Sequence, residues 1–252
     1  MKQSSAARRE PPLGDAARAR VVEVFSSIQG EGLRLGERQI FVRFGGCNLH
    51  CDYCDEPDTI PIPSGELWSG ERLKGEIERL AAERPHASVS WTGGEPLLHA
   101  RFLEGMMRWA RERKLENYLE TNGTLPEPLR ELAPLSSVIA MDLKLPSAEG
   151  RSWWSAHLES LRVAPEKTFA KVVLTRASTD AEFRQVVRLL QEAGPQIPLV
   201  LQPATRTLDS RGTGAWVEPI ERERALAFLR QGLGLLKDVR LIPQWHPVWR
   251  LP

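Results

Sequence analysis

Short apolar and β-branched runs recur along the chain, and each has the length of a single strand. The predicted strands are the runs at 21–27, 39–44, 87–91, 117–119, 138–143, 169–174, 198–201 and 239–242. Arg43 interrupts the second of these runs. An arginine inside an apolar strand is expected to be either paired or functional.

Helical spacing of apolar residues predicts helices between these strands. Ser69 is a suitable N-cap for a helix that begins there, and Thr179 with Glu182 forms the pattern of a capping box. Further helices are expected over about 100–113, 127–132, 150–161 and 220–236, the last with Leu233 on its buried face. The polar, glycine-containing residues 206–217 are expected to form a loop.

Strands and helices alternate roughly six times, which predicts a parallel sheet with crossover helices. The expected fold is α/β, a partial (β/α)6-type, TIM-like barrel with mostly parallel strands. Polar residues gather just after the strands, at 47–54, 93–96, 120–122, 142–147 and Gln202. Because parallel barrels carry their active sites at the carboxyl ends of the strands, these five clusters predict one site.

The composition allows a sizeable core, and its charge balance does not indicate binding to nucleic acid or to a membrane. Of the 252 residues, 41% are hydrophobic, and 34 basic residues nearly balance 33 acidic ones. No apolar run approaches the length of a membrane span. Residues 1–20 lack the apolar segment of a secretory signal and are expected to be a flexible tail before a single domain, 21–252. A reducing, cytoplasmic compartment suits the free thiols.

The three cysteines of the chain, Cys47, Cys51 and Cys54, lie within eight positions. Cysteine thiolates hold iron–sulfur clusters, usually four at a time, so three would leave one iron open to a small molecule. A structural zinc site with His50 as a fourth ligand is the alternative. A disulfide is poorly supported because the number of cysteines is odd.

The spacing Cys-x3-Cys-x2-Cys, followed by Gly-Gly-Glu-Pro at 93–96, resembles the radical S-adenosylmethionine (SAM) superfamily. Within it the chain resembles the 7-carboxy-7-deazaguanine synthase family from about residue 21 onward. The segments that carry this likeness are 28–32, 41–49, 91–96, 120–124, 142–147 and 243–246.

The resemblance implies a [4Fe-4S] cluster held by Cys47, Cys51 and Cys54, with SAM bound to the fourth iron. It also implies an electron donor such as flavodoxin or ferredoxin, because SAM is cleaved by one electron to a radical. The residues expected to bind SAM are Tyr53, Cys54, Asp55, Gly93, Gly94, Glu95, Ser147 and Gln202.

By the same resemblance, the chain is expected to convert 6-carboxy-5,6,7,8-tetrahydropterin to 7-carboxy-7-deazaguanine with loss of ammonia. That makes it a carbon–nitrogen lyase of queuosine-type biosynthesis, and homodimers are usual in the family. Arg43 suits the substrate carboxylate because its guanidinium can pair with both oxygens. The expected substrate contacts are Ile28, Gln29, Gly30, Arg43, Thr92, His246 and Pro252. A tag beyond Pro252 is expected to impair turnover.

One position departs from the family. Glu56 stands where the family usually has a threonine that helps to bind Mg2+. We predict that Glu56 takes over as a Mg2+ ligand, and the alternative is a changed substrate or no metal. Two readings of the whole chain compete with the synthase, namely a glycyl-radical activase and a non-enzymatic, zinc-stabilised module.

Overall fold

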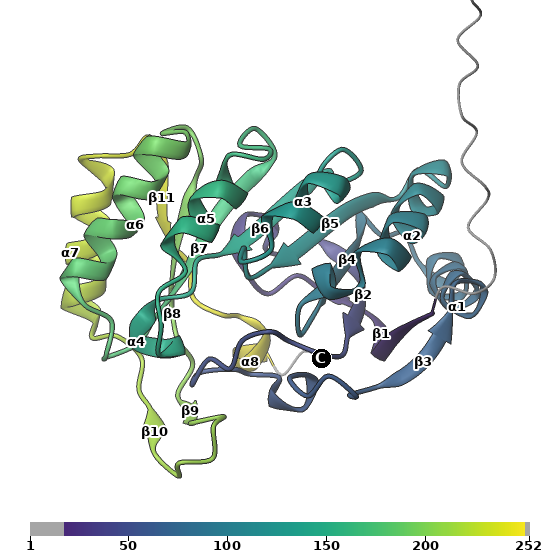
Figure 1. The fold of residues 1–252 in the computed structure, drawn as a ribbon, viewed down its shortest axis with the longest axis horizontal. Coiled ribbons are helices and arrows are strands. Elements are labelled where there is room, and N and C mark those ends of the chain that lie inside the picture. Colours follow the sequence, from purple (N-terminus) through teal and green to yellow (C-terminus); the bar gives the residue numbers. More distant parts are fainter. Residues whose placement is uncertain (1–17, 250–252) are drawn as a thin grey trace, which may run out of the picture.

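A nine-stranded sheet forms the centre of the computed structural model, which describes residues 18–249 (Figure 1). Its strands follow the order β11-β8-β7-β6-β5-β4-β2-β1-β3. They are β1 (Arg18–Ile28), β2 (Arg38–Phe44), β3 (Glu66–Ser69), β4 (Ser88–Gly93), β5 (Glu116–Thr121), β6 (Val138–Asp142), β7 (Thr168–Leu174), β8 (Leu199–Pro203) and β11 (Val239–Leu241). A separate hairpin pairs β9 (Thr207–Leu208) with β10 (Trp216–Val217).

Seven neighbouring strands of the sheet are parallel, namely β2, β4, β5, β6, β7, β8 and β11. Strand β1 runs antiparallel to both β2 and β3. The sheet is open, because β3 and β11 stand at its two edges. The prediction of a partial barrel with mostly parallel strands is therefore confirmed. The antiparallel β1–β3 edge was not predicted.

Helices connect the parallel strands as the apolar spacing predicts. They are α1 (Gly70–Glu83), α2 (Ala100–Glu112), α3 (Pro126–Leu132), α4 (Pro146–Glu149), α5 (Trp154–Leu161), α6 (Asp180–Ala193), α7 (Arg222–Leu233) and α8 (His246–Trp249), with 3-10 turns η1 (Gly32–Arg34), η2 (Pro57–Thr59) and η3 (Pro96–His99). Ser69 caps α1 by accepting from the backbone N–H of Arg72, and Thr179 and Glu182 form both hydrogen bonds of the capping box. Figure 1 shows the longer helices along one side of the sheet and α8 near its middle on the other.

The core between sheet and helices is largely apolar, and Asn117 is a fully buried polar anchor within it. Asn117 on β5 accepts from the indole N–H of Trp91 at 2.9 Å, and its amide donates to the carbonyls of Met107 and Leu135. These bonds satisfy every polar atom of the Asn117 side chain, as burial requires. They also fix β4, β5 and α2 together beneath the carboxyl ends of the strands.

Several predicted boundaries move. Strand β1 begins at Arg18, so residues 18–20 belong to the sheet and not to a tail; residues 1–17 and 250–252 lie outside the described part of the chain. Residues 206–217 contain the β9–β10 hairpin instead of an irregular loop. Leu233 is 53% exposed, because α7 turns Ala225, Phe228 and Gly232 to the core. Within residues 18–249, none of the helices has the length and apolarity to cross a membrane.

Candidate active site

A cavity of about 420 Å3 opens at the edge where the parallel strands end. It lies among residues that follow β2, β4, β5, β6 and β8, and β1 and the segment before α8 complete its wall. Most of the predicted site residues line it: Ile28, Gln29, Gly30, Arg43, Cys47, Cys51, Tyr53, Cys54, Asp55, Glu56, Thr92, Gly93, Gly94, Gln202 and His246. The predicted convergence on one sheet edge is therefore observed.

The cysteine loop (residues 47–54) carries three free thiols into this cavity. Burial raises the pKa of the Cys51 thiol to about 12 and that of Cys54 to about 11, and it raises the pKa of Cys47 as well. The charge of Lys144 opposes these shifts without overcoming them. Burial thus favours the neutral thiol at all three positions, and a bound cation would stabilise the deprotonated form that metal ligation needs.

The spacing of the thiols favours a cluster over a single zinc ion. Zinc holds sulfur at about 2.3 Å, so two sulfur ligands of one zinc lie at most about 4.6 Å apart. Among residues 18–249, the group whose ligand atoms lie within 4.8 Å of one another is Glu31, Asp55 and His246, and not the cysteines. His50 is exposed and lies 3.3 Å from the carbonyl of Ser210.

Gly93 and Gly94 bring two backbones into close contact beside the thiols. Gly93 has φ +117°, and a Cβ there would lie 2.3 Å from the backbone N and O of Phe44. A Cβ on Gly94 would lie 2.1 Å from the carbonyl oxygen of Gly46. Only glycine fits at both positions, so the turn after β4 can lie directly against the end of β2.

Glu95, which was expected to contact SAM, lies outside the cavity. It is fully buried, and its carboxylate accepts from Asn122 N–H at 2.8 Å, Thr121 Oγ1 at 2.9 Å and Leu97 N–H at 3.0 Å. Burial raises the pKa of Glu95 to about 7 against these bonds. Its contacts tie the turn after β4 to the end of β5.

Ser147 also lies outside the cavity lining, on α4, where its backbone N–H donates to Glu182 at 2.6 Å. Gln202, by contrast, lines the cavity while being fully buried. Both of its amide atoms lack a hydrogen-bond partner among the described residues. A buried amide without partners is costly, so Gln202 indicates a polar ligand in the cavity.

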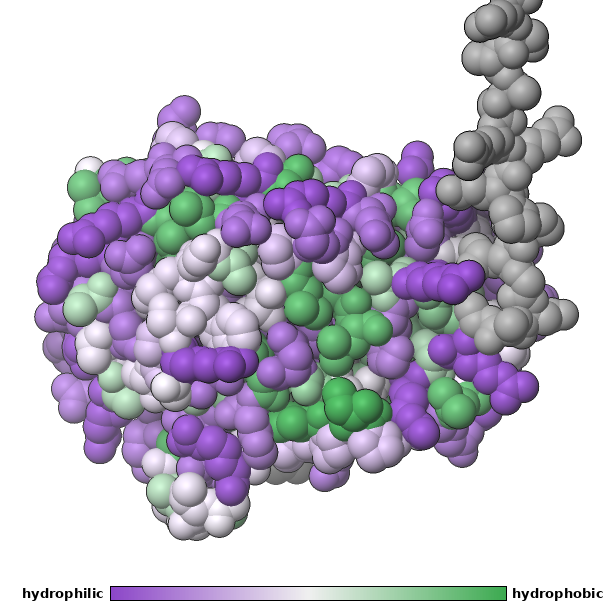
Figure 2. Space-filling view, viewed as in Figure 1, coloured by the Kyte–Doolittle hydropathy of each residue, from purple (hydrophilic) through white to green (hydrophobic). Residues whose placement is uncertain are grey.

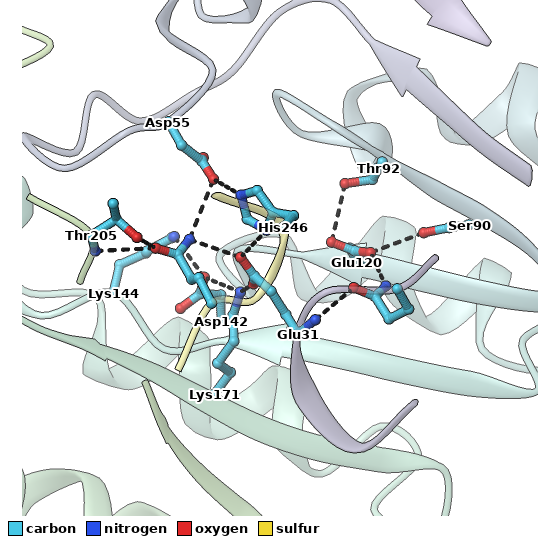
Figure 3. Close-up of polar contacts among 12 residues, drawn as sticks. Glu31, Asp55, Ser90, Thr92, Glu120, Asp142, Lys144, Lys171, Thr205 and His246 are labelled. Atoms are coloured by element: carbon cyan, nitrogen blue, oxygen red, sulfur yellow. Dashed lines mark hydrogen bonds and ion pairs between the residues drawn. The ribbon is translucent and has the colours of Figure 1, made fainter. Parts of the chain in front are cut away.

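The wall formed by β1, β4 and β5 presents a carboxylate and an amide. Glu120 Oε1 accepts from Gln29 Nε2 at 3.0 Å and from Ser90 Oγ at 2.9 Å. Glu120 Oε2 accepts from Thr92 Oγ1 at 3.1 Å (Figure 3). This array fixes Glu120 and Gln29 in place, and the side-chain oxygens of both can accept further hydrogen bonds.

Arg43 is held between two carboxylates. Its Nε lies 2.6 Å from Glu23 Oε1, and its Nη2 lies 3.1 Å from Glu56 Oε1. Glu56 is half-buried, and burial raises its pKa against the charge of Arg43. Of the two expectations for this arginine, paired or functional, the structure shows the pairing.

Four alternating charges form a row along the cavity. Glu31 pairs with Lys171, whose Nζ lies 3.4 Å from Asp142 Oδ2, and Lys144 donates to that oxygen at 2.8 Å (Figure 3). Burial opposes ionisation of both carboxylates. Lys171, helped by a hydrogen bond from Gln244, outweighs burial and lowers the pKa of Glu31, and Lys144 and Lys171 together lower the pKa of Asp142. The carboxylates in turn raise the pKa of both lysines against burial. All four groups are therefore ionised near neutral pH.

Gln244, just before α8, and His246, the first residue of α8, close one side of the cavity. His246 lies 3.7 Å from Glu31 and 3.6 Å from Asp55, and Gln244 donates to Glu31 at 2.8 Å. Burial lowers the pKa of His246, but the two carboxylates outweigh it and raise the pKa. A Cβ on Gly30 would lie 2.9 Å from the His246 backbone, so this contact requires glycine. Pro252 lies outside the described residues.

The sequence motifs did not single out several cavity residues. Glu31, Asp142 and Lys144 lie inside recognised motifs, yet no role was assigned to them. Lys171 carried a usable signal, because it interrupts an apolar run as Arg43 does. The pairing of these charges depends on strand neighbours, which the linear sequence does not give.

Comparison with known proteins gives consistent matches. Residues 41–201 match the Radical SAM superfamily. The 7-carboxy-7-deazaguanine synthase of Geobacter sulfurreducens is 36% identical over 247 residues, covering 90% of this chain and 96% of that protein. The enzyme of the same name from Methanothermobacter thermautotrophicus is also 36% identical, over 91% and 96%.

Solved structures agree on the fold. The crystal structure of QueE from Escherichia coli matches with a TM-score of 0.62 and 19% identity, covering 90% of this chain and 94% of that one. A structure of TYW1 with a lysine-pyruvate adduct matches with a TM-score of 0.52 and 16% identity. At such identities these likenesses support the fold alone.

Proposed function

The chain belongs to the 7-carboxy-7-deazaguanine synthase family of radical SAM enzymes, and we propose that it converts 6-carboxy-5,6,7,8-tetrahydropterin to 7-carboxy-7-deazaguanine. Ammonia leaves, so the enzyme is a carbon–nitrogen lyase in 7-deazapurine biosynthesis of the queuosine type. One observation carries the proposal: the three thiols share a cavity with Arg43 and with the Glu120–Gln29 wall. This family assignment sets aside the glycyl-radical activase and the zinc module.

The cysteine loop and the unpartnered Gln202 suit the family's cofactors. Cys47, Cys51 and Cys54 would hold the [4Fe-4S] cluster, and Gln202 would satisfy its amide on SAM. When bound, these groups supply the one-electron chemistry that removes a hydrogen atom from the substrate. The closely packed Gly93–Gly94 backbone contributes a wall without side chains.

The polar wall suits a pterin. Its ring edge carries N–H groups that a fixed carboxylate can accept, and Glu120 is such a carboxylate, held by Ser90, Thr92 and Gln29. In the opposite part of the cavity, Lys171 and Lys144 alternate with Glu31 and Asp142, so this side offers both cationic donors and anionic acceptors. His246, with its raised pKa, would donate a proton or a hydrogen bond at the cavity wall.

The substrate carboxylate would bind Arg43, which requires Glu56 to give up its place on that guanidinium. We propose that the displaced Glu56 carboxylate then binds Mg2+, a cation that takes oxygen ligands. The test is the Mg2+ dependence of turnover in Glu56→Ala and in Glu56→Thr, which restores the residue usual in the family. Glu56→Ala should lose the dependence and Glu56→Thr should keep it. Equal Mg2+ dependence in the unsubstituted protein and Glu56→Ala would refute this role.

An anaerobic assay tests the reaction. Reconstituted protein, SAM, a chemical reductant, Mg2+ and 6-carboxytetrahydropterin should yield 7-carboxy-7-deazaguanine, detected by mass spectrometry over many turnovers. Cleavage of SAM without a deazapurine product would refute the proposed substrate and leave the family assignment intact. Arg43→Lys is an informative variant, because it keeps the charge but loses the bidentate fork, so KM should rise more than kcat falls.

The remaining expectations concern partners. The reaction needs a one-electron donor, and a flavodoxin or ferredoxin in the cytoplasm is proposed. A homodimer is proposed from the family, and light scattering of the purified protein at micromolar concentration tests it.

A further inference from the structure

The β9–β10 hairpin (residues 207–217) projects from the body of the protein (Figures 1 and 2). Its turn is built by the buried carboxylate of Asp209. This carboxylate accepts from the backbone N–H of Arg211 at 2.9 Å, from Arg211 Nε at 3.0 Å and from Thr213 Oγ1 at 2.6 Å. The three hydrogen bonds to the Asp209 carboxylate give the turn of the hairpin a defined conformation.

The turn of the hairpin touches the cysteine loop at its centre. Ser210 N–H donates to the carbonyl of Asp52 at 2.9 Å, and Ser210 Oγ donates to the carbonyl of Cys51 at 2.7 Å. Arg211 Nη2 lies 3.6 Å from Asp52 Oδ2, and the carbonyl of Ser210 lies 3.3 Å from His50 Nε2. Two adjacent hairpin residues thus contact three consecutive residues of the loop.

Other parts of the protein hold mainly the start of the loop. Cys47 N–H donates to the carbonyl of Ile60 at 3.0 Å, and Asn48 donates to Thr124 at 2.8 Å. The middle forms one backbone bond to α4, where Asp52 N–H donates to the carbonyl of Ala148 at 3.1 Å. The hairpin therefore supplies the second support of the segment around Cys51.

We propose that the β9–β10 hairpin is a clamp that fixes the backbone at Cys51 and Asp52, so that the three thiols are positioned before the cluster binds and the cluster is retained afterwards. Ser210 and Arg211 are the positioning residues of this clamp. The inference rests on the proposed ligation of the cluster by Cys47, Cys51 and Cys54. Two physical effects support the clamp. A loop that is already ordered loses less conformational entropy when the cluster binds. Contacts made by residues that are not ligands themselves orient the ligands.

The clamp is tested first in the metal-free protein, by hydrogen exchange of residues 50–54. Ser210→Ala removes the hydroxyl bond to the Cys51 carbonyl, and Arg211→Gln removes the ion pair with Asp52. Loss of one hydrogen bond should speed exchange in this segment about fivefold. Ser152→Ala is the matched control, because Ser152 is an exposed serine outside both the hairpin and the cysteine loop. Its exchange in residues 50–54 should equal that of the unsubstituted protein.

The reconstituted protein gives a second readout. Ser210→Ala should lose its cluster to an iron chelator about fivefold faster, and the electron paramagnetic resonance spectrum of the reduced cluster should change. Exchange in residues 50–54 that matches the control, or that speeds up equally across all helices and strands, would overturn the clamp. Failure of the proposed function is distinguishable, because it would appear as absent iron binding or turnover in the unsubstituted protein while the exchange result stands.

Discussion

Lys171→Met should destabilise the fold by much more than removal of a surface charge. Lys171 lies between Glu31 and Asp142, and the side chains of these three residues are 13%, 17% and 15% exposed. With Lys144, the row carries two positive and two negative charges. Methionine has a similar length but no charge, so the substitution leaves Glu31 without its main partner and the row with a net negative charge.

The expected loss follows from the cost of an unpaired buried charge. Breaking a buried ion pair from one side costs about 3–5 kcal/mol. We take the lower end, about 3 kcal/mol, because the three side chains keep contact with cavity water. A surface pair is worth about 0–1 kcal/mol. Lys74→Met, which removes a pair with Glu71 on α1, is therefore the matched control.

The stability lost in Lys171→Met should depend on pH, because the substitution changes the pKa of Glu31. In the unsubstituted protein the folded pKa of Glu31 is lowered, so its contribution is present above the unfolded pKa and is lost as pH falls through the folded value. In Lys171→Met, burial is no longer outweighed, and the folded pKa of Glu31 should rise above 4.5, its ordinary value. The difference between the two proteins should then be largest at pH 7 and should narrow toward pH 4.

Urea unfolding of the metal-free proteins at pH 7 and pH 5 measures both effects. Glu31→Gln combined with Lys171→Met should recover part of the loss, because the orphaned charge is gone. A loss of less than 1 kcal/mol in Lys171→Met, equal to that in Lys74→Met, would refute the reasoning. So would a difference that stays constant between pH 7 and pH 5.

Three further outcomes are expected. Gly93→Ala should lower the free energy of unfolding in urea by about 3 kcal/mol or more. Gly36→Ala is the control and should lower it by about 1 kcal/mol, because Gly36 has φ +88° but no atom within 4 Å of an added Cβ. Equal losses in the two variants would refute the packing argument. Gln202→Leu should weaken SAM binding about tenfold in calorimetry without lowering the stability of the metal-free protein, because the amide has no protein partner to lose; unchanged affinity would show that the amide does not face SAM. The folded pKa of His246 is raised, so the contribution of His246 to stability is lost as pH rises through that pKa. Between about pH 6 and pH 8.5, His246→Gln should therefore lose less stability in urea unfolding than the unsubstituted protein. Equal changes of stability with pH in the two proteins would contradict this.

The sequence predicts the parallel part of the fold well, because each strand carries a continuous apolar run and each helix an apolar face. Ser69 and the Thr179 capping box mark two helix starts correctly. The edge strand β3 was missed because its burial is low and prolines precede it. Leu233 was misplaced, because helical spacing alone leaves two neighbouring faces of α7 open, and packing against β11 and α6 decides between them.

The sequence predicted a site residue well where a motif specifies it. It predicted less well where hydrogen-bond partners determine which way the side chain points. Gly93 and Gln202 lie in the cavity as expected, but Glu95 faces the interior, since three donors from β5 and η3 bind its carboxylate. Nothing in the sequence around Ser210 predicts its contact with Cys51, because the two residues meet only through the fold.

The contact between Gly30 and the segment before α8 bears on how the protein matures during synthesis. Trp245 N–H donates to the carbonyl of Gly30 at 3.0 Å, and His246 packs against the same glycine. One wall of the cavity thus comes from the first strand of the sheet and the adjoining wall from the last described helix. A nascent chain that has released every parallel strand from the ribosome still has an open-sided pocket. Completion of the site therefore requires synthesis as far as residue 246, because a chain interrupted earlier lacks this wall of the cavity.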